Sequence, residues 1–313
     1  MSTAELTFII VNYNTAALLK DCVTSIQNHT TIPHTIVVVD NNSSDNSVAL
    51  VQQQFPNVYL IQNKENSGYP IAVNQGLQAV DSNYYFILNS DIQIQEHCVL
   101  TLLNYMEAHP HAGICAPFQF TPDGQPILSV YPYPTLTREW TRNLFFTDYR
   151  RYRLRGTKLA QQVQGPQAVE WVMGAAMFVR RSMVSTCGYM DEAIFMYGEE
   201  MDWCYRAQAK GWQIHIVPDA KIMHYQSASA DIFLNTNRYQ LIVKSNFRFF
   251  FKYYKHWQFP FFLMAQFIGS FIRMILAFIL CLLGKKSFRD QMEEHYKVLV
   301  SFFDPELYRW VRQ

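Results

Sequence analysis

The chain has 313 residues, of which 50% are hydrophobic and 16% charged, and its net charge is +1. An average soluble domain has about 25% charged residues, so this chain has ample apolar side chain and is not a disordered protein. The near-zero net charge does not fit a general polyanion binder, and no nucleic-acid partner is expected. At roughly 150 residues per domain, the length fits one large domain or two modest ones.

Six cysteines are spread along the chain without a CxxC pair or metal-finger spacing. Disulfides are rare in the cytosol, so these cysteines are predicted to be reduced, buried thiols. The N-terminal segment has no basic stretch, and its apolar run is short for a signal peptide. The sequence therefore predicts a cytoplasmic protein.

Short apolar runs alternate with helical patterns in the first ninety residues. Four runs rich in β-branched and aromatic residues are predicted strands: 6–11, 35–39, 58–61 and 84–88. Helices are predicted after Thr15 as N-cap, over 47–55, and from Pro70 to about Val80. This βαβ alternation predicts an α/β fold with a mostly parallel sheet.

Polar clusters follow three of the predicted strands, at 12–14, 40–45 and 89–91. Ligands of parallel sheets gather beyond the carboxyl ends of the strands, so this rim is the predicted site. The loop after the first strand has no glycine, which excludes a GxGxxG fingerprint and a P-loop there. Diphosphate charge would then be neutralised by a carboxylate-bound divalent metal, and Asp91 is the candidate ligand.

Several blocks follow one another in an order typical of one enzyme family. They are VNYN (11–14), VVVDNNSSDNS (37–47), ENSGYPIAVNQG (65–76), LNSD (88–91), WVMGAAMFVRR (171–181), GYMDEAIFMYGEEMDWCYRAQAKGW (188–212) and PDAKIMHYQSAS (218–229). Together they resemble the inverting glycosyltransferases of family 2, which have the GT-A (nucleotide-diphospho-sugar transferase) fold. The nearest branch is the rhamnosyltransferase-like enzymes of bacterial cell-envelope polysaccharide synthesis. The resemblance covers residues 6 to about 230.

The resemblance implies a set of residues that line the nucleotide and sugar of the donor. These donor-binding residues are Val11, Tyr13, Asn14, Asp40, Asn42, Asn66, Gly68, Asn74, Asn89, Ser90, Asp91 and Gly174. Asp40 matches the position that contacts the base, and Gly174 lies in a segment placed under the sugar and acceptor. A core strand is the alternative interpretation of that segment.

The resemblance also implies a divalent metal, Mn²⁺ or Mg²⁺, on the donor diphosphate. The family's DXD motif reads Asn89-Ser90-Asp91 here, so its first acid is an amide. Asp91 matches the retained ligand, and His224 stands where related enzymes supply a histidine ligand. A lone histidine beside apolar residues is more often structural in an unknown protein. With one carboxylate fewer, the metal is expected to arrive with the nucleotide.

Three acids, Glu199, Glu200 and Asp202, open a predicted helix that ends near Gly211. Acids in a first turn also stabilise the helix dipole without any catalytic role. Glu199, Asp202 and Arg206 share one face, which suits an internal salt bridge. Inverting transfer needs a general base, and by resemblance Glu200 is that base. Glu199 and Asp202 would orient the acceptor or the helix.

The strand after Gly174 ends in Arg180 and Arg181. One of them could approach the donor diphosphate, and a solvated strand end is the equal alternative.

The segment 122–165 has no family motif and is rich in arginine and aromatic residues. Such a patch suits anionic lipid headgroups or nucleic acid, or it is a solvated insertion. The stretch 259–283 is almost continuously apolar, has cations on both sides and is long enough to span a bilayer. Arg273 near its middle favours an in-plane or re-entrant membrane-associated segment over a spanning helix, and a buried oligomerisation helix pair is a further alternative.

The predicted organisation is a GT-A domain over 1–230, with the insertion 122–165, and a helical, membrane-associated region over 231–313. The predicted enzyme moves a sugar from dTDP-rhamnose or a UDP-sugar to a lipid-linked glycan or polysaccharide. It would act at the cytoplasmic face of the plasma membrane as a peripheral or monotopic protein, and a homodimer is compatible with it. The alternatives are a non-catalytic sugar-nucleotide-binding partner protein, suggested by Asn89, and a sugar-phosphate nucleotidyltransferase. The latter usually has a glycine-rich loop that is missing here.

Overall fold

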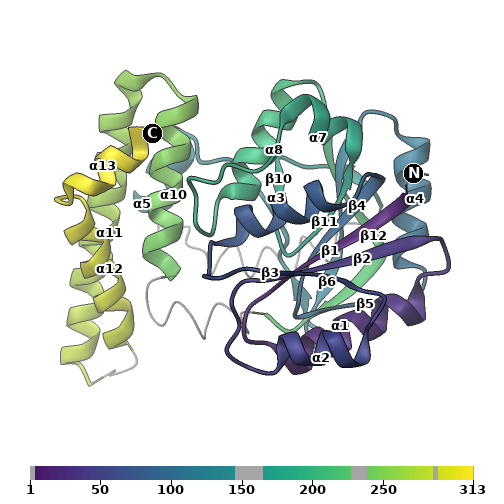
Figure 1. Cartoon of the computed structure of the whole chain (residues 1–313). Coiled ribbons are helices and arrows are strands. Elements are labelled where there is room, and N and C mark those ends of the chain that lie inside the picture. The colour runs from purple at the N-terminus through teal and green to yellow at the C-terminus, as the bar shows by residue number, and fades with distance from the viewer. Residues whose placement is uncertain (1–3, 145–164, 227–237, 285–287, 313) are drawn as a thin grey trace. The chain divides into compact units, whose positions relative to one another are not determined.

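The computed structural model describes residues 4–144, 165–226, 238–284 and 288–312 (Figure 1). It divides into two compact units. The first comprises Met1–Tyr133 and Arg155–Phe233, and the second comprises Pro134–Leu154 and Leu234–Gln313. The predicted insertion 122–165 therefore contributes to both units. Its most basic part, over 145–164, lies outside the described residues.

The first unit is a layered α/β structure. Its strands are β1 (Ala4–Asn12), β2 (His34–Asp40), β3 (Tyr59–Gln62), β4 (Ser82–Asn89), β5 (Ile92–Ile94), β6 (Ala112–Phe120), β7 (Pro126–Ile127), β8 (Val130–Tyr131), β9 (Gln167–Ala168), β10 (Trp171–Val172), β11 (Ala176–Arg180) and β12 (Gln213–His224). Its helices are α1 (Ala16–His29), α2 (Ser47–Gln54), α3 (Tyr69–Ala79), α4 (Cys98–Ala108), α7 (Arg181–Cys187) and α8 (Glu199–Ala209).

The main sheet has the strand order β3-β2-β1-β4-β11-β6-β12-β5. The four strands predicted from the first ninety residues are confirmed, and they form one parallel block. Strand β11 runs antiparallel to both β4 and β6, and β6 and β12 are again parallel. The sheet is therefore mixed. The strands β1 to β4, whose carboxyl ends carry the predicted site, pair in parallel.

Alternate residues of β1 enter two different cores, because both faces of the sheet are covered. Leu6, Phe8 and Ile10 belong to the core that α1 and α4 complete. Ile9 and Val11 belong to the core that α3, α7 and α8 complete. Figure 1 shows α3, α7 and α8 on one side of the sheet and α1 and α2 on the other.

The register of β1 brings the polar strand ends together. Asn12 lies opposite Asp40 of β2, and Val11 lies opposite Asn89 of β4. The polar segments that follow these strands therefore start at the same edge of the sheet, as the alternating pattern predicted.

Thr15 occupies the N-cap position of α1, as predicted, but its side chain makes no capping hydrogen bond. Its hydroxyl donates instead to Asn12 Oδ1 at 2.7 Å. The carboxylate of Asp45 accepts the hydrogen bond of the first helical N–H, from Ala16, at 2.9 Å. A side chain from the loop after β2 therefore caps α1, in place of the side chain at the N-cap position.

The second unit consists of helices. They are α5 (Leu136–Leu144), α10 (Arg238–Tyr253), the 3₁₀ turn η1 (His256–Gln258), α11 (Phe259–Leu282), α12 (Arg289–Ser301) and α13 (Pro305–Arg312). Its core is built from Val243, Phe247, Phe250, Phe262, Val298, Leu307 and Val311. The apolar stretch 259–283 is thus one continuous helix, and by length and composition it is long and apolar enough to cross a membrane.

Close packing of α3 on β1 provides a test of the first unit. A Cβ atom at Gly76 would lie 2.3 Å from Ile9 Cγ2. Gly76→Ala is therefore expected to cost about 1–3 kcal/mol of unfolding free energy, as overpacked cores usually do. Urea denaturation followed by circular dichroism measures it.

The control is Ile9→Ala alone and combined with Gly76→Ala. Removing the opposing side chain should relieve the clash, so the double variant should be more stable than the sum of the two single losses predicts. Additive losses would contradict the packing argument.

Candidate active site

The loops after β1 and β2 are joined through Asp40. Its side chain is buried, and it accepts hydrogen bonds from Asn12 Nδ2 at 2.8 Å and from Ser43 Oγ at 2.6 Å. It also accepts from the N–H of Ser43 at 2.9 Å. The predicted base-contacting residue therefore fixes the two loops to each other. Val11, one residue before Asn12, is buried in the sheet core.

Two asparagines shape the exposed part of these loops. Asn14 and Asn42 both have left-handed backbone conformations, with φ of 53° and 64°. The side-chain oxygen of Asn14 accepts from the N–H of Ser44 at 2.7 Å, which ties the first loop to the second. Tyr13 is half-buried and Asn42 is exposed. These positions remain predicted donor contacts.

Gly68 lies in the loop between β3 and α3, at the point where this loop contacts the segment before α8. Its φ is 91°, and a Cβ atom there would lie 2.6 Å from the carbonyl oxygen of Phe195. The N–H of Tyr69 donates to the same carbonyl at 2.9 Å. The Asn66 side chain accepts from the N–H of Gly68 at 3.2 Å. The loop that was predicted to line the donor thus holds the backbone of the segment that leads into the acidic helix.

Asn74, another predicted donor residue, has a structural contact that the sequence did not indicate. It is buried on α3, its amide donates to Met190 O at 3.0 Å, and its oxygen accepts from Met190 N at 3.0 Å. A further hydrogen bond goes to Glu192 at 2.9 Å. Asn74 therefore joins α3 to the segment at Met190.

Asp91 and His224 lie side by side at the end of the sheet. Asp91 Oδ1 is 3.4 Å from His224 Nε2, and both side chains are buried. Asp91 Oδ1 has no hydrogen-bond partner among the described residues. The other ring nitrogen, His224 Nδ1, is 2.9 Å from Gln119 Oε1. An Nδ1–H donated to Gln119 leaves Nε2 with its lone pair directed to Asp91.

This pair fits the protein side of a divalent-metal site. A buried carboxylate oxygen without a donor and an imidazole nitrogen oriented by a hydrogen-bonded amide are ligands that such a cation accepts. No group of three or more His, Cys, Asp or Glu is arranged to hold a metal among the residues that the structure describes. The protein would therefore contribute two ligands, and the donor phosphates the others.

The two residues before Asp91 differ in exposure. Ser90 is buried and its hydroxyl lies 2.7 Å from that of Thr15, so it connects β4 to the start of α1. Asn89 is half-buried, and its backbone N–H donates to Ala175 O at 3.0 Å. The motif is therefore attached to the first loop on one side and to the 173–175 turn on the other.

The predicted salt bridge at the start of α8 is present for one of its two acids. Arg206 Nε donates to Asp202 Oδ2 at 2.7 Å, and the same guanidinium also reaches the carbonyls of Cys187 and Tyr189. Glu199 does not join this network. Its side chain is buried, and its Oε2 has no hydrogen-bond partner among the described residues. Asp202 thus anchors the helix, while Glu199 lies inside the site.

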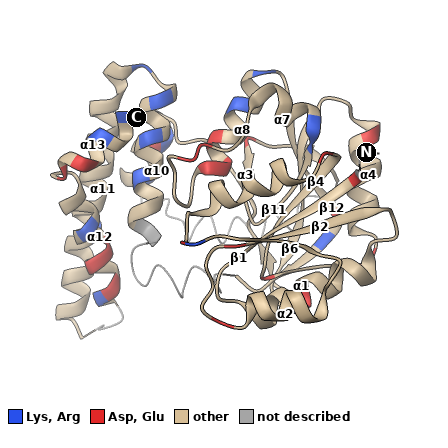
Figure 2. Ribbon diagram, in the orientation of Figure 1, with Lys and Arg blue, Asp and Glu red and all other residues tan. Residues whose placement is uncertain are grey.

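Glu200 is adjacent to Gly174 and Tyr69. A Cβ atom at Gly174 would lie 3.6 Å from Glu200 Cβ and 3.6 Å from Tyr69 Cε1. The Tyr69 hydroxyl donates to Gly174 O at 2.6 Å. The backbone at residue 174 therefore separates the phenol from the carboxylate, and larger side chains there would fill this space. Figure 2 shows acidic positions gathered beside α8.

Tyr69 interacts electrostatically both with the glutamates of α8 and with Asp91. Burial raises the pKa of Tyr69 well above its ordinary value, and the negative charges of Glu199, Glu200 and Asp91 raise it further. Burial and the charge of Glu200 raise the pKa of Glu199 well above its ordinary value. Burial also raises the pKa of Glu200, partly offset by backbone hydrogen bonds from Glu200 itself, Gly198 and Gly174. The charges of three carboxylates thus act on one buried phenol, and proton uptake by the glutamates is favoured.

Arg180 and Arg181 lie at the other end of β11. Because β11 is antiparallel to β4, Arg180 pairs with Tyr84 near the start of β4, whereas Ala176 pairs with Leu88 near its end. Arg180 donates to Ala112 O at 3.0 Å, and Arg181 forms an exposed ion pair with Asp81 at 2.9 Å. The structure therefore favours the strand-end alternative over a contact with the donor diphosphate.

Two residues of the site were not singled out from the sequence. Tyr69 stood inside the block 65–76 without an assigned role, and Gln119 lay in an apolar strand. A polar residue in a strand whose neighbours are all apolar is the signal that could have found Gln119. Its position opposite His224 depends on the β6–β12 pairing, which sequence alone does not give.

Known proteins share both the sequence pattern and the fold. The sequence profile of the family described as glycosyl transferase family 2 matches residues 7–186. The chain belongs to this family. It is 30% identical over 247 residues to an N-acetylglucosaminyl-diphospho-decaprenol L-rhamnosyltransferase of Mycobacterium tuberculosis, covering 72% of this chain and 78% of that protein. It is 27% identical over 181 residues to the rhamnosyltransferase WbbL of Escherichia coli, covering 56% and 65% of the two chains.

Solved structures show the same fold. The mannosyltransferase PcManGT from Pyrobaculum calidifontis, in complex with GDP-Man and Mn²⁺, superposes with a TM-score of 0.58 at 16% identity, covering 96% of this chain and 86% of that one. GalNAc-T7 with UDP, GalNAc and Mn²⁺ gives a TM-score of 0.56 at 16% identity, covering 78% and 48%. The GT-A fold and the assignment as a glycosyltransferase of the rhamnosyltransferase-like branch are thereby confirmed.

The buried Glu199 carboxylate gives a stability prediction. A carboxyl whose folded pKa is raised stabilises the fold fully only below its unfolded pKa, and this contribution is lost as the pH rises through the folded pKa. Glu199→Gln keeps the shape without the charge, so it is expected to stabilise the protein by about 1–3 kcal/mol above neutral pH. Thermal unfolding from pH 5.5 to 8.5 measures it.

Glu192→Gln, on an exposed residue nearby, is the matched control and should leave the pH profile unchanged. An advantage of Glu199→Gln that shrinks with rising pH would contradict the assignment.

Proposed function

We propose that this site transfers a sugar from a nucleoside-diphosphate donor to an acceptor hydroxyl with inversion at the anomeric carbon. The observation that carries the proposal is that the backbone at 174–175 connects the two groups of acids. Glu200 and Tyr69 lie beside Gly174, and Asn89, two residues before Asp91, donates to Ala175 O. Inverting transfer needs both a means of stabilising the leaving diphosphate and a base on the acceptor side. Family membership favours this reaction over the nucleotidyltransferase alternative.

The loops around Asp40 and Gly68 hold the donor in this proposal. The hydrogen bonds of Asp40 fix the first two loops before a ligand arrives, so little ordering entropy remains to be lost on binding. Asn14 and Asn42, which have left-handed backbone conformations, form the rim of these two loops. The nucleotide would lie along this rim, with its diphosphate toward Asp91.

Asp91 and His224 would hold the divalent cation, with Gln119 orienting the imidazole. A cation bound there supplies charge neutralisation to the departing diphosphate. Both structural neighbours were solved with Mn²⁺, which supports this choice. The chain's own contribution is a buried carboxylate oxygen without a competing hydrogen-bond donor.

Glu200 would remove the proton from the attacking hydroxyl. Its raised pKa makes it a stronger base than an exposed carboxylate while it is ionised. The N–H of Gly198 donates to Glu200 Oε2 at 3.0 Å and fixes one oxygen, so the other is available to the acceptor. Glu199 precedes the base in the chain, and the charge of Glu200 favours proton uptake by Glu199. Asp202 positions the helix through Arg206.

The acceptor proposed is a lipid-linked glycan, and the donor proposed is dTDP-rhamnose. The Mycobacterium relative is named for rhamnosyl transfer to N-acetylglucosaminyl-diphospho-decaprenol, a lipid-linked sugar. Helix α11 gives this chain an apolar segment compatible with such a substrate. The reaction would then take place at the cytoplasmic face of the plasma membrane. A thermal-shift panel of nucleotide sugars with and without Mn²⁺ tests the donor directly.

Asp91→Ala and Glu200→Gln separate the two halves of the mechanism. Asp91→Ala is expected to abolish the Mn²⁺-dependent part of nucleotide binding, because a ligand is lost. Glu200→Gln is expected to leave donor binding within about twofold and to lower kcat by about 10²–10⁴-fold, the usual contribution of a general base. Isothermal titration with the nucleotide and a single-turnover transfer assay measure the two effects.

Asp81→Ala serves as the control, since this exposed aspartate pairs with Arg181 away from the site. The proposal would be overturned by Asp91→Ala binding the nucleotide with unchanged Mn²⁺ dependence, or by Glu200→Gln retaining full transfer.

Gln119 gives a separate prediction for the metal site. Gln119→Leu removes the acceptor for His224 Nδ1, so the apparent affinity for Mn²⁺ in the presence of nucleoside diphosphate should fall by about 10–100-fold. Gln119→Glu keeps an acceptor oxygen and should retain most of the affinity. Mn²⁺ titration followed by electron paramagnetic resonance reads binding without requiring turnover. Equal affinities in Gln119→Leu and the unmodified protein would remove His224 from the site.

A further inference from the structure

Apart from Phe262, the buried residues of helix α11 are polar or small, and its exposed residues are mostly large and apolar. The buried positions include Gln266, Gly269, Ser270 and Ala277. The large apolar side chains that are exposed from this helix and the turn before it are Trp257, Phe261, Met264, Phe271, Ile275, Leu276, Phe278, Ile279, Leu282 and Leu283. A water-soluble helix has the opposite arrangement, because apolar side chains are stabilised by burial.

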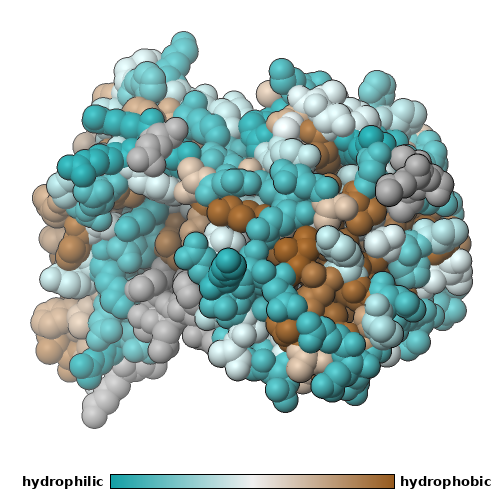
Figure 3. Space-filling model, in the orientation of Figure 1, coloured by the Kyte–Doolittle hydropathy of each residue, from teal (hydrophilic) through white to brown (hydrophobic). Residues whose placement is uncertain are grey.

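The exposed apolar residues form two groups on one side of the helix, before residue 265 and after residue 270, with the half-buried Ile268 between them. Steps of four and three residues connect Trp257, Phe261 and Met264, and then Phe271, Ile275, Phe278 and Leu282. Residues at these steps lie on one side of a helix. At a rise of 1.5 Å per residue the face extends over about 36 Å. Figure 3 shows hydrophobic side chains at the left edge of the molecule, where Figure 1 places α11 and α12. An apolar face of this length marks an interaction site.

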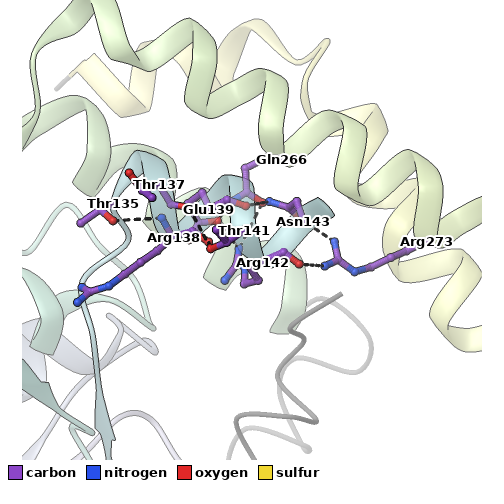
Figure 4. A network of polar contacts seen from close by, with 9 residues as sticks. All are labelled: Thr135, Thr137, Arg138, Glu139, Thr141, Arg142, Asn143, Gln266 and Arg273. Atoms are coloured by element: carbon purple, nitrogen blue, oxygen red, sulfur yellow. Dashed lines mark hydrogen bonds and ion pairs between the residues drawn. The ribbon is translucent and has the colours of Figure 1, made fainter. Parts of the chain in front are cut away.

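The inner face of α11 carries a polar network with α5 (Figure 4). Arg273 donates to Asn143 Oδ1 at 2.7 Å and to Arg142 O at 3.1 Å. Gln266 donates to Glu139, whose carboxylate also pairs with Arg142 at 2.6 Å. The only charged residue of α11 is thus directed at a neighbouring helix and away from the apolar face.

Gly269 permits this contact. A Cβ atom there would lie 2.0 Å from Asn143 Oδ1, so the side chain of α5 occupies the space that any other residue would fill. Gly269 stands between Gln266 and Arg273, at the centre of the network. Helix α5 therefore packs on the middle of α11, not on one of its ends.

We propose that the outer face of α11 docks into the interfacial region of a lipid bilayer, with the helix lying in the membrane plane. The cations near its ends support a membrane as the occupant. Lys252 and Lys255 are exposed shortly before α11, and Arg289 is exposed at the start of α12, where it also pairs with Glu293 at 3.8 Å. Together with exposed Trp257, they match the anionic headgroups and interfacial zone of such a surface. The proposal does not depend on the transfer reaction.

The contacts of α11 are incompatible with a bilayer-spanning orientation. A spanning helix would place its middle at the centre of the hydrocarbon, where α5 packs against it. Thr137, Arg138 and Thr141 of α5 are exposed, so they would enter the hydrocarbon as well. Helix α12 also packs on α11 and exposes Asp290 and Glu293. An orientation in the membrane plane leaves these charges in water and buries only the apolar face.

The same face does not have the features of a helix pair between two copies. A coiled-coil seam is narrow and is flanked by charged side chains that select the partner. Here Leu276 and Ile279 widen the exposed apolar face, and the helix has no charged residue except Arg273, which is directed at α5. A broad and uncharged face suits a fluid apolar partner.

Vesicle flotation tests the docking face. The double variant Phe271→Glu/Phe278→Glu is expected to reduce binding to vesicles of equal phosphatidylcholine and phosphatidylglycerol by about tenfold or more. The control Leu100→Glu alters an apolar residue on α4 that is 43% exposed, against 45% for Phe271. It should bind like the unmodified protein. Both should retain the circular dichroism and donor hydrolysis of the unmodified protein, which separates docking from the transfer reaction.

Labelling tests the orientation in the membrane. Lys255→Cys and Gly284→Cys place one thiol beyond each end of α11, in a background with Cys187→Ser and Cys281→Ser. In sealed vesicles with the protein added outside, a membrane-impermeant maleimide should modify both thiols.

Three results would overturn the proposal. They are unchanged flotation of the double variant, protection of one thiol only, which indicates a spanning helix, and a dimer in light scattering that the double variant dissociates. The last result would assign the face to a second copy of the chain.

Discussion

The parallel register of β1 with its two neighbours is the constraint on which the site depends. It sets Asn12 opposite Asp40 and Val11 opposite Asn89, so three loops begin at one edge of the sheet. Every later contact uses this arrangement, from the Asp40 hydrogen bonds to the attachment of Ser90 to Thr15. A slip by one residue would reverse which face each side chain of β1 occupies and would exchange its two cores.

Burial of like charges is the second feature of the site. The charges of Glu199, Glu200 and Asp91 act on the phenol of Tyr69, and Glu199 and Asp91 each have an oxygen without a hydrogen-bond partner among the described residues. Buried carboxylates of this kind are costly in a folded protein, and they are enriched at functional sites.

Much of the first unit followed from sequence because its strands are short apolar runs closed by polar clusters, and periodicity identifies these well. The common edge of the polar clusters followed from topology alone. The N-cap position of Thr15 followed from sequence, but the role of Asp45, thirty residues later, in accepting the first helical N–H did not. The role of Arg180 and Arg181 stayed open until the antiparallel direction of β11 was known. Gln119 and Asn74 have partners more than a hundred residues away, so no local pattern could reveal their contacts.

The pairing of α5 with α11 has a consequence for the order in which the chain is made. Residues 136–144 leave the ribosome before residues 259–282, because synthesis proceeds from the N-terminus. The acceptors for Arg273 are thus already present when the apolar helix emerges. Arg273, the one charged residue of α11, can therefore form its hydrogen bonds as soon as the helix is synthesised. The apolar segment does not have to carry an unpaired charge while the rest of the chain is made.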